Sequence, residues 1–364
     1  MKKSFAVIAI MIVVLAAYSC RKTPVAPAKT AYLDLPVTPY QYFDTTFSNG
    51  IITNRMATLG RVLFYDGHLS ISNTVSCASC HKQALAFADN AALSTGFEGR
   101  LTKRNAPGIF DLNQKRSFFW DGRENELFNL AVRPISNHVE MGMDDGAALA
   151  QKLSALSYYG PLFAAAYGDE QVTTERISQS IAMFMVSINS SHSRLDEYEM
   201  GNTAALTAQE IAGKSLFDTK YNCGSCHNNG NVVVFTTGGY SGGGGAVFLD
   251  IGLNTDYTDM GRGTISRMQS DNGTFAVPSL KNVALTAPYM HDGRYKTLGE
   301  VIDHYSKGIM GSPNLDPLLT DGKGHARSMN ITEQDKQAII AFLGTLTDNQ
   351  MITDPKFSNP FKSK

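Results

Sequence analysis

A five-residue pattern that can attach a prosthetic group occurs twice in this chain of 364 residues. Residues 77–81 read Cys-Ala-Ser-Cys-His, and residues 223–227 read Cys-Gly-Ser-Cys-His. Cys-x-x-Cys-His is the attachment signature of c-type haem, in which both thiols add to vinyl groups and the histidine becomes an axial ligand of the iron. We therefore expect two covalent haem c groups, held by Cys77, Cys80 and His81 and by Cys223, Cys226 and His227.

Two other uses of these cysteines explain less of the pattern. A structural zinc site would need two more ligands near each cysteine pair. A disulfide would leave both histidines unexplained. The two copies also take up four of the five cysteines in the chain, which chance seldom produces.

The composition indicates what class of protein the chain forms. The length suggests two domains, and a hydrophobic content of 43% with a charged content of 18% indicates a globular chain with a substantial core. The formal net charge of −1 gives no reason to expect nucleic acid or an acidic membrane surface as a partner.

The first residues form a targeting segment. Lys2 and Lys3 precede an apolar stretch over residues 5–18, and the chain then reads Ser19-Cys20. We expect a signal peptide over residues 1–19 that resembles a lipoprotein signal, and a tether over residues 20–44 that meets the membrane only through a lipid on Cys20. The alternative is an ordinary secretory signal with an incidental cysteine. Both place the protein outside the cytoplasm, in the periplasm, where c-type haem is attached.

An internal repeat predicts the domain organisation. Residues 59–66 (Leu-Gly-Arg-Val-Leu-Phe-Tyr-Asp) precede the first haem motif, and residues 212–218 (Ala-Gly-Lys-Ser-Leu-Phe-Asp) precede the second. We expect a mainly α fold of two cytochrome c-like domains, each with one haem, long loops and little sheet. The predicted ranges are 45–203, 204–350 and a poorly ordered tail at 351–364.

Further helices follow from periodicity and capping. Apolar residues at helical spacing predict a helix over residues 175–199. Thr207 with Glu210 and Thr297 with Glu300 have the spacing of capping boxes, and Thr332 is placed to cap a helix over 333–346. The glycine-dense residues 238–245 lack the context of a phosphate-binding loop and are expected to form an irregular loop beside the second haem.

Two residues between the motifs are candidates for chemistry. Glu140 has the carboxylate that peroxide cleavage needs, because one oxygen must lose a proton and the other must gain it. The alternative is an ordinary surface glutamate. Trp120 is the single tryptophan and could relay electrons between two haems, or could simply fill an aromatic core.

The order of several short motifs resembles the bacterial dihaem cytochrome c peroxidase family, which also contains MauG. The resemblance runs from Leu59 to about Tyr305. It rests on the two haem motifs and on the segments Arg104-Asn105-Ala106-Pro107, Phe119-Trp120-Asp121-Gly122-Arg123, Glu140-Met141-Gly142 and Leu285 to Gly293.

The resemblance implies roles for individual residues. The N-terminal haem, held by His81, would be the peroxidatic one, with Glu140 as its distal acid–base residue. Trp120 would lie between the haems, and the haem held by His227 would accept electrons. A calcium ion would be bound by the side chain of Asn105 and the carbonyls of Thr286 and Pro288, which are the hard oxygen ligands that calcium prefers.

The chain departs from the family pattern near the N-terminal haem. Phe97 stands where many members carry a histidine that caps the peroxidatic iron until the other haem is reduced. The N-terminal haem would then be open without reductive activation, unless His68 or His138 substitutes. Leu130 stands where peroxidases usually have a glutamine near the distal pocket.

A second departure concerns the C-terminal haem. Tyr305 occupies the position of the usual methionine ligand, as a tyrosine does in MauG. A phenolate favours ferric iron and would lower the potential of this haem. Met290, Met310 and His304 are the alternative ligands.

These features favour a peroxidase that reduces hydrogen peroxide to water with electrons from a small c-type cytochrome or similar periplasmic donor. The alternative is a MauG-like dihaem oxidase that modifies a protein or other substrate through a high-valent state of the haem pair. A plain electron carrier would have no use for an acid–base group such as Glu140. The sequence leaves the oligomeric state open, including a homodimer.

Overall fold

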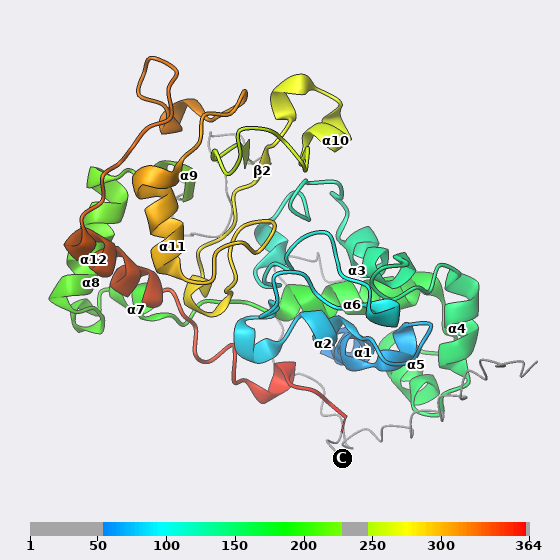
Figure 1. The fold of residues 1–364 in the computed structure, drawn as a ribbon. Helices are drawn as coiled ribbons and strands as arrows, with labels where there is room; N and C mark the ends of the chain where they lie inside the picture. Colours follow the sequence, from blue (N-terminus) through cyan, green and yellow to red (C-terminus); the bar gives the residue numbers. More distant parts are fainter. Residues whose placement is uncertain (1–53, 228–246, 362–364) are drawn as a thin grey trace, which may run out of the picture. The chain divides into compact units, whose positions relative to one another are not determined.

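The computed structural model describes residues 54–227 and 247–361 (Figure 1). The predicted signal peptide, the lipid site at Cys20, the tether and the glycine-dense loop at 238–245 lie outside these residues. None of the described helices is long and apolar enough to cross a membrane.

The described residues are mainly helical, as the sequence predicted. One antiparallel pair of two-residue strands, β1 (Phe248–Leu249) and β2 (Phe275–Ala276), is present, with Phe248 opposite Ala276. The α-helices are α1 (Asn54–Tyr65), α2 (Cys77–Cys80), α3 (Leu127–Ser136), α4 (Gly146–Ser154), α5 (Tyr159–Tyr167), α6 (Thr174–Ser187), α7 (Arg194–Glu199), α8 (Ala208–Ser215), α9 (Gly224–His227), α10 (Gly263–Ser266), α11 (Leu298–Asp303) and α12 (Glu333–Gly344).

Shorter helical turns connect these elements. π-helical turns continue α8 over Leu216–Lys220 and α11 over His304–Gly308. The 3-10 turns are Gly67–Leu69, Gln83–Leu85, Phe97–Gly99, Leu112–Gln114, Thr203–Ala205, Gln269–Asp271, Val283–Leu285, Pro317–Leu319 and Pro355–Phe357.

The internal repeat has a physical counterpart in two helix crossings. Gly60 of α1 crosses α6, and a Cβ atom at Gly60 would lie 1.8 Å from the carbonyl oxygen of Ser180. Gly213 of α8 crosses α12, and a Cβ atom there would lie 2.0 Å from the carbonyl oxygen of Ala338. Because only glycine permits backbones to approach so closely, the same residue of each repeat packs a haem-delivering helix against its partner.

The predicted helix caps are present. The Thr207–Glu210 and Thr297–Glu300 pairs form reciprocal capping boxes at α8 and α11. Thr332 accepts a hydrogen bond from the backbone N–H of Asp335 at the start of α12. These caps satisfy backbone donors that have no partner inside the helix.

The buried apolar residues form two clusters. The first includes Phe64, Phe87 and Phe184, and the second includes Phe217 and Phe342. Leu195 packs in the second cluster, although it precedes the predicted boundary at residues 203–204. That boundary stays a prediction.

Two expectations about the chain were wrong. The predicted helix over 175–199 is two helices, α6 and α7, because the backbone becomes extended at Ile188 and a new capping box begins at Ser193. Residues 351–361, which belong to the segment predicted to be a poorly ordered tail, pack against the first cluster. Phe357 is 2% exposed and packs in the first cluster, and its carbonyl accepts a hydrogen bond of 2.7 Å from the Tyr65 hydroxyl.

Candidate functional site

One cavity of about 660 Å³ is lined by all the residues predicted to attach haem, to ligate a metal or to take part in catalysis. Phenylalanine, leucine, isoleucine and valine side chains make up much of its wall, as expected for a site that receives a large, flat apolar group. The predicted residues on the wall are Cys77, Cys80, His81, Asn105, Trp120, Glu140, Cys223, Cys226, His227, Thr286, Pro288 and Tyr305.

The two motif histidines are oriented alike. Nδ1 of His81 lies 2.7 Å from the carbonyl oxygen of Phe87, and Nδ1 of His227 lies 3.2 Å from that of Pro278. A ring nitrogen that faces a carbonyl must carry the proton, so Nε2 of each ring is left free to ligate a metal. Burial lowers the pKa of both imidazoles, that of His227 to about 4, which keeps them neutral.

The four motif cysteines are free thiols that face the cavity. Burial raises the pKa of Cys77 and of Cys223 to about 12. Each thiol pair therefore lies, uncharged, beside a histidine with a free Nε2 and an apolar cavity wall. This donor set fits a covalently attached haem at both motifs, and it lacks the additional ligands of a structural zinc site.

Glu140 lies in the wall of the cavity near the first motif. Burial raises the pKa of its carboxyl group, against the opposing effects of the Arg123 charge and a hydrogen bond from Asn137. That bond joins Asn137 Nδ2 to Glu140 Oε1 at 2.8 Å, so the second carboxylate oxygen is left for another partner. Glu140 is therefore a partly buried acid with an elevated pKa and not a surface glutamate.

The backbone around Glu140 is fixed by close approach of a second loop. A Cβ atom at Gly96 would lie 2.1 Å from the carbonyl oxygen of Val139 and 2.8 Å from Cα of Glu140. The backbone N–H of Phe97 donates to the carbonyl of Glu140 at 2.8 Å. Only a glycine at position 96 therefore allows the two loops to approach each other this closely.

Phe97 does not line the cavity. A Cβ atom at Gly142 would lie 3.0 Å from its ring, and the Arg100 guanidinium lies 5.7 Å from the ring centroid. A phenyl ring also has no atom able to ligate iron. The position therefore provides no capping ligand.

The two histidines considered as substitutes are occupied elsewhere. Nδ1 of His68 lies 2.7 Å from Oδ1 of buried Asp66, whose other oxygen accepts hydrogen bonds from Tyr158 and Tyr159. The side chain of His138 is 69% exposed and lies 3.5 Å from Asp144. Neither His68 nor His138 lines the cavity.

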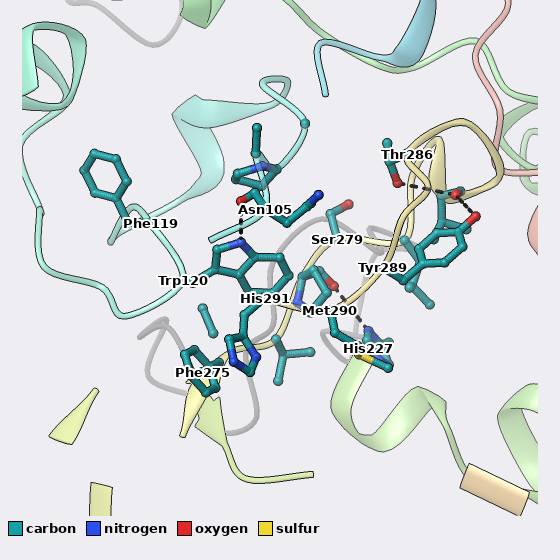
Figure 2. A pocket seen from close by; sticks show the side chains of 18 of the residues that line it. Asn105, Phe119, Trp120, His227, Phe275, Ser279, Thr286, Tyr289, Met290 and His291 are labelled. Carbon is teal, nitrogen blue, oxygen red and sulfur yellow. Dashed lines mark hydrogen bonds between the residues drawn. The ribbon is translucent and has the colours of Figure 1, made fainter. Parts of the chain in front are cut away.

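Trp120 is held through both its indole and its backbone, and Figure 2 shows the indole bond to Asn105. Its Nε1 donates to the carbonyl oxygen of Asn105 at 2.9 Å, and its own carbonyl accepts from the N–H of Ala276 at 2.8 Å. Next to it, Arg104 bonds Asp121 at 2.6 Å and binds both oxygens of Asp259 at 2.7 and 2.8 Å. The indole is therefore a positioned part of the cavity wall.

The predicted calcium ligands Asn105, Thr286 and Pro288 line the same cavity, and Figure 2 labels Asn105 and Thr286. Nδ2 of Asn105 donates to the carbonyls of Ala91 and Ala92 at 3.1 and 3.3 Å, which leaves Oδ1 free to accept a partner. No group of three or more His, Cys, Asp or Glu residues able to hold a metal occurs in the described residues. A cation here would depend on neutral oxygens, which is compatible with calcium.

Tyr305 lies in the π-helical turn after α11 and faces the cavity near the second motif. Burial raises the pKa of its phenol, and the nearby Cys223 and Cys226 raise it further. His304 is engaged with the carbonyl of Ile251 at 2.9 Å, and Met310 is 46% exposed, so neither reaches the cavity.

Met290 does line the cavity, and so does Met329, which sequence reasoning missed. Met329 precedes α12 in an irregular loop, where no periodicity marks a side chain as inward-facing. Asn137 was also missed, although its spacing of three residues from Glu140 was a usable signal. Leu130 lines the cavity as a purely apolar side chain.

Comparisons with known proteins match the chain to dihaem cytochrome c peroxidases and to MauG. The model of the di-haem cytochrome c peroxidase family matches residues 54–204. The chain is 31% identical over 298 residues to the methylamine utilization protein MauG of Methylorubrum extorquens, covering 81% of this chain and 79% of that one. It is 32% identical over 310 residues to the cytochrome c551 peroxidase of Nitrosomonas europaea, covering 84% and 82%.

Among solved structures, the chain is similar to a MauG-like protein associated with microbial copper homeostasis. The identity is 33% and the TM-score is 0.76, over 85% of this chain and 94% of that one.

Proposed function

Because the chain belongs to the di-haem cytochrome c peroxidase family, which also includes MauG, we propose that it reduces hydrogen peroxide to water with electrons from a c-type cytochrome or a similar donor. The chain is an oxidoreductase of a family that carries two covalent haem c groups. The bound haems supply the redox-active iron on which peroxide is reduced.

The proposal rests on the location and the raised pKa of Glu140. Its side chain is a partly buried carboxyl group with a raised pKa in the cavity that His81 also lines. A carboxylate at this place can take the proton from one peroxide oxygen and return it to the other, which then leaves as water. An electron carrier needs no such group.

Other residues set the conditions for that proton transfer. Phe87 fixes the ring of His81 through its carbonyl, and Asn137 holds one oxygen of Glu140. The second oxygen of Glu140 then moves the proton. Leu130 adds an apolar side chain to the cavity wall that Glu140 also lines, where it would limit the access of water to a bound haem.

Electrons are proposed to enter at the C-terminal haem and to reach the N-terminal haem past Trp120. Trp120 is suited to this because both its indole and its backbone are hydrogen-bonded in the cavity wall. Tyr305 is the proposed sixth ligand of the C-terminal iron, and iron coordination would offset the burial that raises the pKa of its phenol. A calcium ion on Asn105 Oδ1 and the carbonyls of Thr286 and Pro288 would stiffen the region around Trp120.

Turnover with a reduced c-type cytochrome tests the proposal. Purified holoprotein should oxidise the cytochrome in the presence of peroxide at a rate proportional to holoprotein concentration. If the cytochrome becomes oxidised no faster than with an unrelated mono-haem carrier, the protein is an electron carrier.

A second candidate is a MauG-like oxidase that modifies a protein or other substrate. Two observations favour it: Phe97 provides no capping ligand, and Tyr305 takes the place of the usual methionine. An electron paramagnetic resonance spectrum of the ferric protein addresses both points. One high-spin and one low-spin haem without a thioether signature supports both assignments, whereas two low-spin haems would mean that the N-terminal iron is capped.

The related peroxidases fit an exported protein, and haem c attachment takes place after export. We propose that the chain is held at the membrane by a lipid on Cys20. Labelling with a radioactive fatty acid tests this, with Cys20→Ser as the unlabelled control. A homodimer is a further proposal that sedimentation analysis addresses.

A further inference from the structure

Three charged side chains occur together where the two haem motifs share their cavity. Lys115 and Lys281 line the cavity, and Asp111 lies beside them at 3% exposure. Two ammonium groups and one carboxylate leave an excess of positive charge in a largely apolar wall. A charged group that faces an apolar wall without a partner is energetically costly, so such a group normally faces an anion.

Asp111 is fixed by the backbone of the segment between α6 and α7. Its N–H donates to the carbonyl of Ile188 at 2.9 Å, and its Oδ1 accepts from the N–H of Ser190 at 3.0 Å. Its second oxygen, Oδ2, lies 3.4 Å from Nζ of Lys281. The carboxylate cannot move to another partner without breaking these bonds.

Lys281 is already satisfied. Its ammonium pairs with Asp111 and also donates to the carbonyl of Ser190. Lys281 follows Pro278, whose carbonyl holds His227, by three residues. It therefore belongs to the wall near the C-terminal haem motif.

Lys115 has no comparable partner. Its ammonium lies 5.9 Å from the ring centroid of Phe110, and it makes no hydrogen bond or ion pair with the described part of the chain. Burial lowers the pKa of Lys115, and only the charge of Asp111 opposes that effect. Asp111 is therefore near enough to act on Lys115 through its charge, but the described residues offer this ammonium no hydrogen-bonded or ion-paired anion.

The backbone places Lys115 beside the N-terminal haem motif. Phe110, under its ammonium, follows Ile109, whose N–H donates to the carbonyl of Phe87 at 3.3 Å. The same carbonyl accepts the hydrogen bond from Nδ1 of His81. Lys115 thus extends from the segment that orients the proximal histidine of this site.

We propose that Lys115 binds a propionate carboxylate of the N-terminal haem and that Asp111, shared with Lys281, limits the positive charge at this place. A haem brings two carboxylates at one edge of an otherwise apolar ring, which matches a single unpaired ammonium in an apolar wall. Lys115 is then a cofactor-binding residue. The assignment depends on haem attachment and is independent of whether the protein is a peroxidase.

The charge of Lys115 would influence the iron. A cation near the haem disfavours the ferric state, which carries one more positive charge than the ferrous state. Lys115→Met should therefore lower the midpoint potential of the N-terminal haem and leave that of the C-terminal haem unchanged. Lys115→Arg keeps the charge and should leave both potentials near wild type.

A redox titration that resolves the two haems measures this, with haem content and thermal unfolding recorded on every variant. Lys103→Met is the matched control, because Lys103 is an exposed lysine in the same part of the chain. If Lys115→Met loads haem poorly, Lys115→Gln replaces it in the titration. Failure of both neutral variants to hold the N-terminal haem, with Lys115→Arg loading normally, also supports the proposal.

Two results would overturn it. The neutral variants could leave the N-terminal potential unchanged, as Lys115→Arg is expected to do, or could shift both potentials equally. Each would show that the ammonium does not meet a carboxylate of that haem.

Discussion

Replacement of Glu140 by glutamine should remove proton transfer while it leaves the local structure unchanged. The Glu140 carboxylate accepts a hydrogen bond of 2.8 Å from Asn137, and the carbonyl of a glutamine side chain can accept the same bond. Size and the main contact are therefore kept, and only the ability to carry a proton is lost. General acid–base catalysis contributes about 10²–10⁴-fold, which corresponds to roughly 3–5 kcal/mol at about 1.4 kcal/mol per tenfold.

The expected loss is larger than any indirect effect of the change. Weakening one hydrogen bond costs about 0.5–1.5 kcal/mol, or roughly tenfold at most. Peroxide-dependent oxidation of a reduced c-type cytochrome gives the rate, and the haem spectrum shows that the site is intact. Glu98→Gln is the control, because the Glu98 side chain is 54% exposed and pairs with Arg100.

The reasoning would be refuted by a loss of less than about threefold in Glu140→Gln with unchanged haem content. It would also be refuted if Glu98→Gln reduced the rate as much, since a general effect of charge would then be sufficient.

Further predictions concern pH, the axial ligand, haem attachment and calcium. Burial raises the pKa of Glu140, so the rate should fall with decreasing pH at a higher pH than for an ordinary glutamate, and Asn137→Ala should move that fall higher because it removes a bond that lowers the pKa. Tyr305→Met should raise the potential of the C-terminal haem and introduce a thioether–iron absorption band. If the spectrum does not change, Met290 or Met329 would be the ligand instead of Tyr305. Mass spectrometry should find two covalent haems in the wild type and impaired attachment at the N-terminal motif in Cys77→Ala. Chelation should slow electron transfer between the haems reversibly, and elemental analysis without calcium would remove the proposed site.

Short-range capping was predictable from the sequence, because the capping boxes at Thr207 and Thr297 depend on residues three apart. The spacing within the two Cys-x-x-Cys-His motifs predicts haem attachment at these residues, and that attachment stays a prediction. The repeated glycine of the delivering helices was visible too, although its role in two helix crossings required coordinates.

Contacts between distant parts of the sequence were not predictable. The extended backbone at Ile188 follows from its carbonyl meeting Asp111, far away in the chain. Phe357 looked like part of a loose tail because its partners, Tyr65 and Phe87, lie near the opposite end of the sequence. The unpaired ammonium of Lys115 has no sequence signal, since a lysine in a polar stretch is usually solvated.

The central claim is that peroxide reaches an open N-terminal haem site beside Glu140. Rapid mixing of fully oxidised holoprotein with peroxide tests it most directly, because Phe97, His68 and His138 all fail to supply a capping ligand from the cavity wall. We predict an immediate loss of ferric Soret absorbance without prior reduction, and a much slower loss in Glu140→Gln. An oxidised protein that is inert to peroxide and reacts only after one-electron reduction would contradict the account, since another group would then close the N-terminal iron.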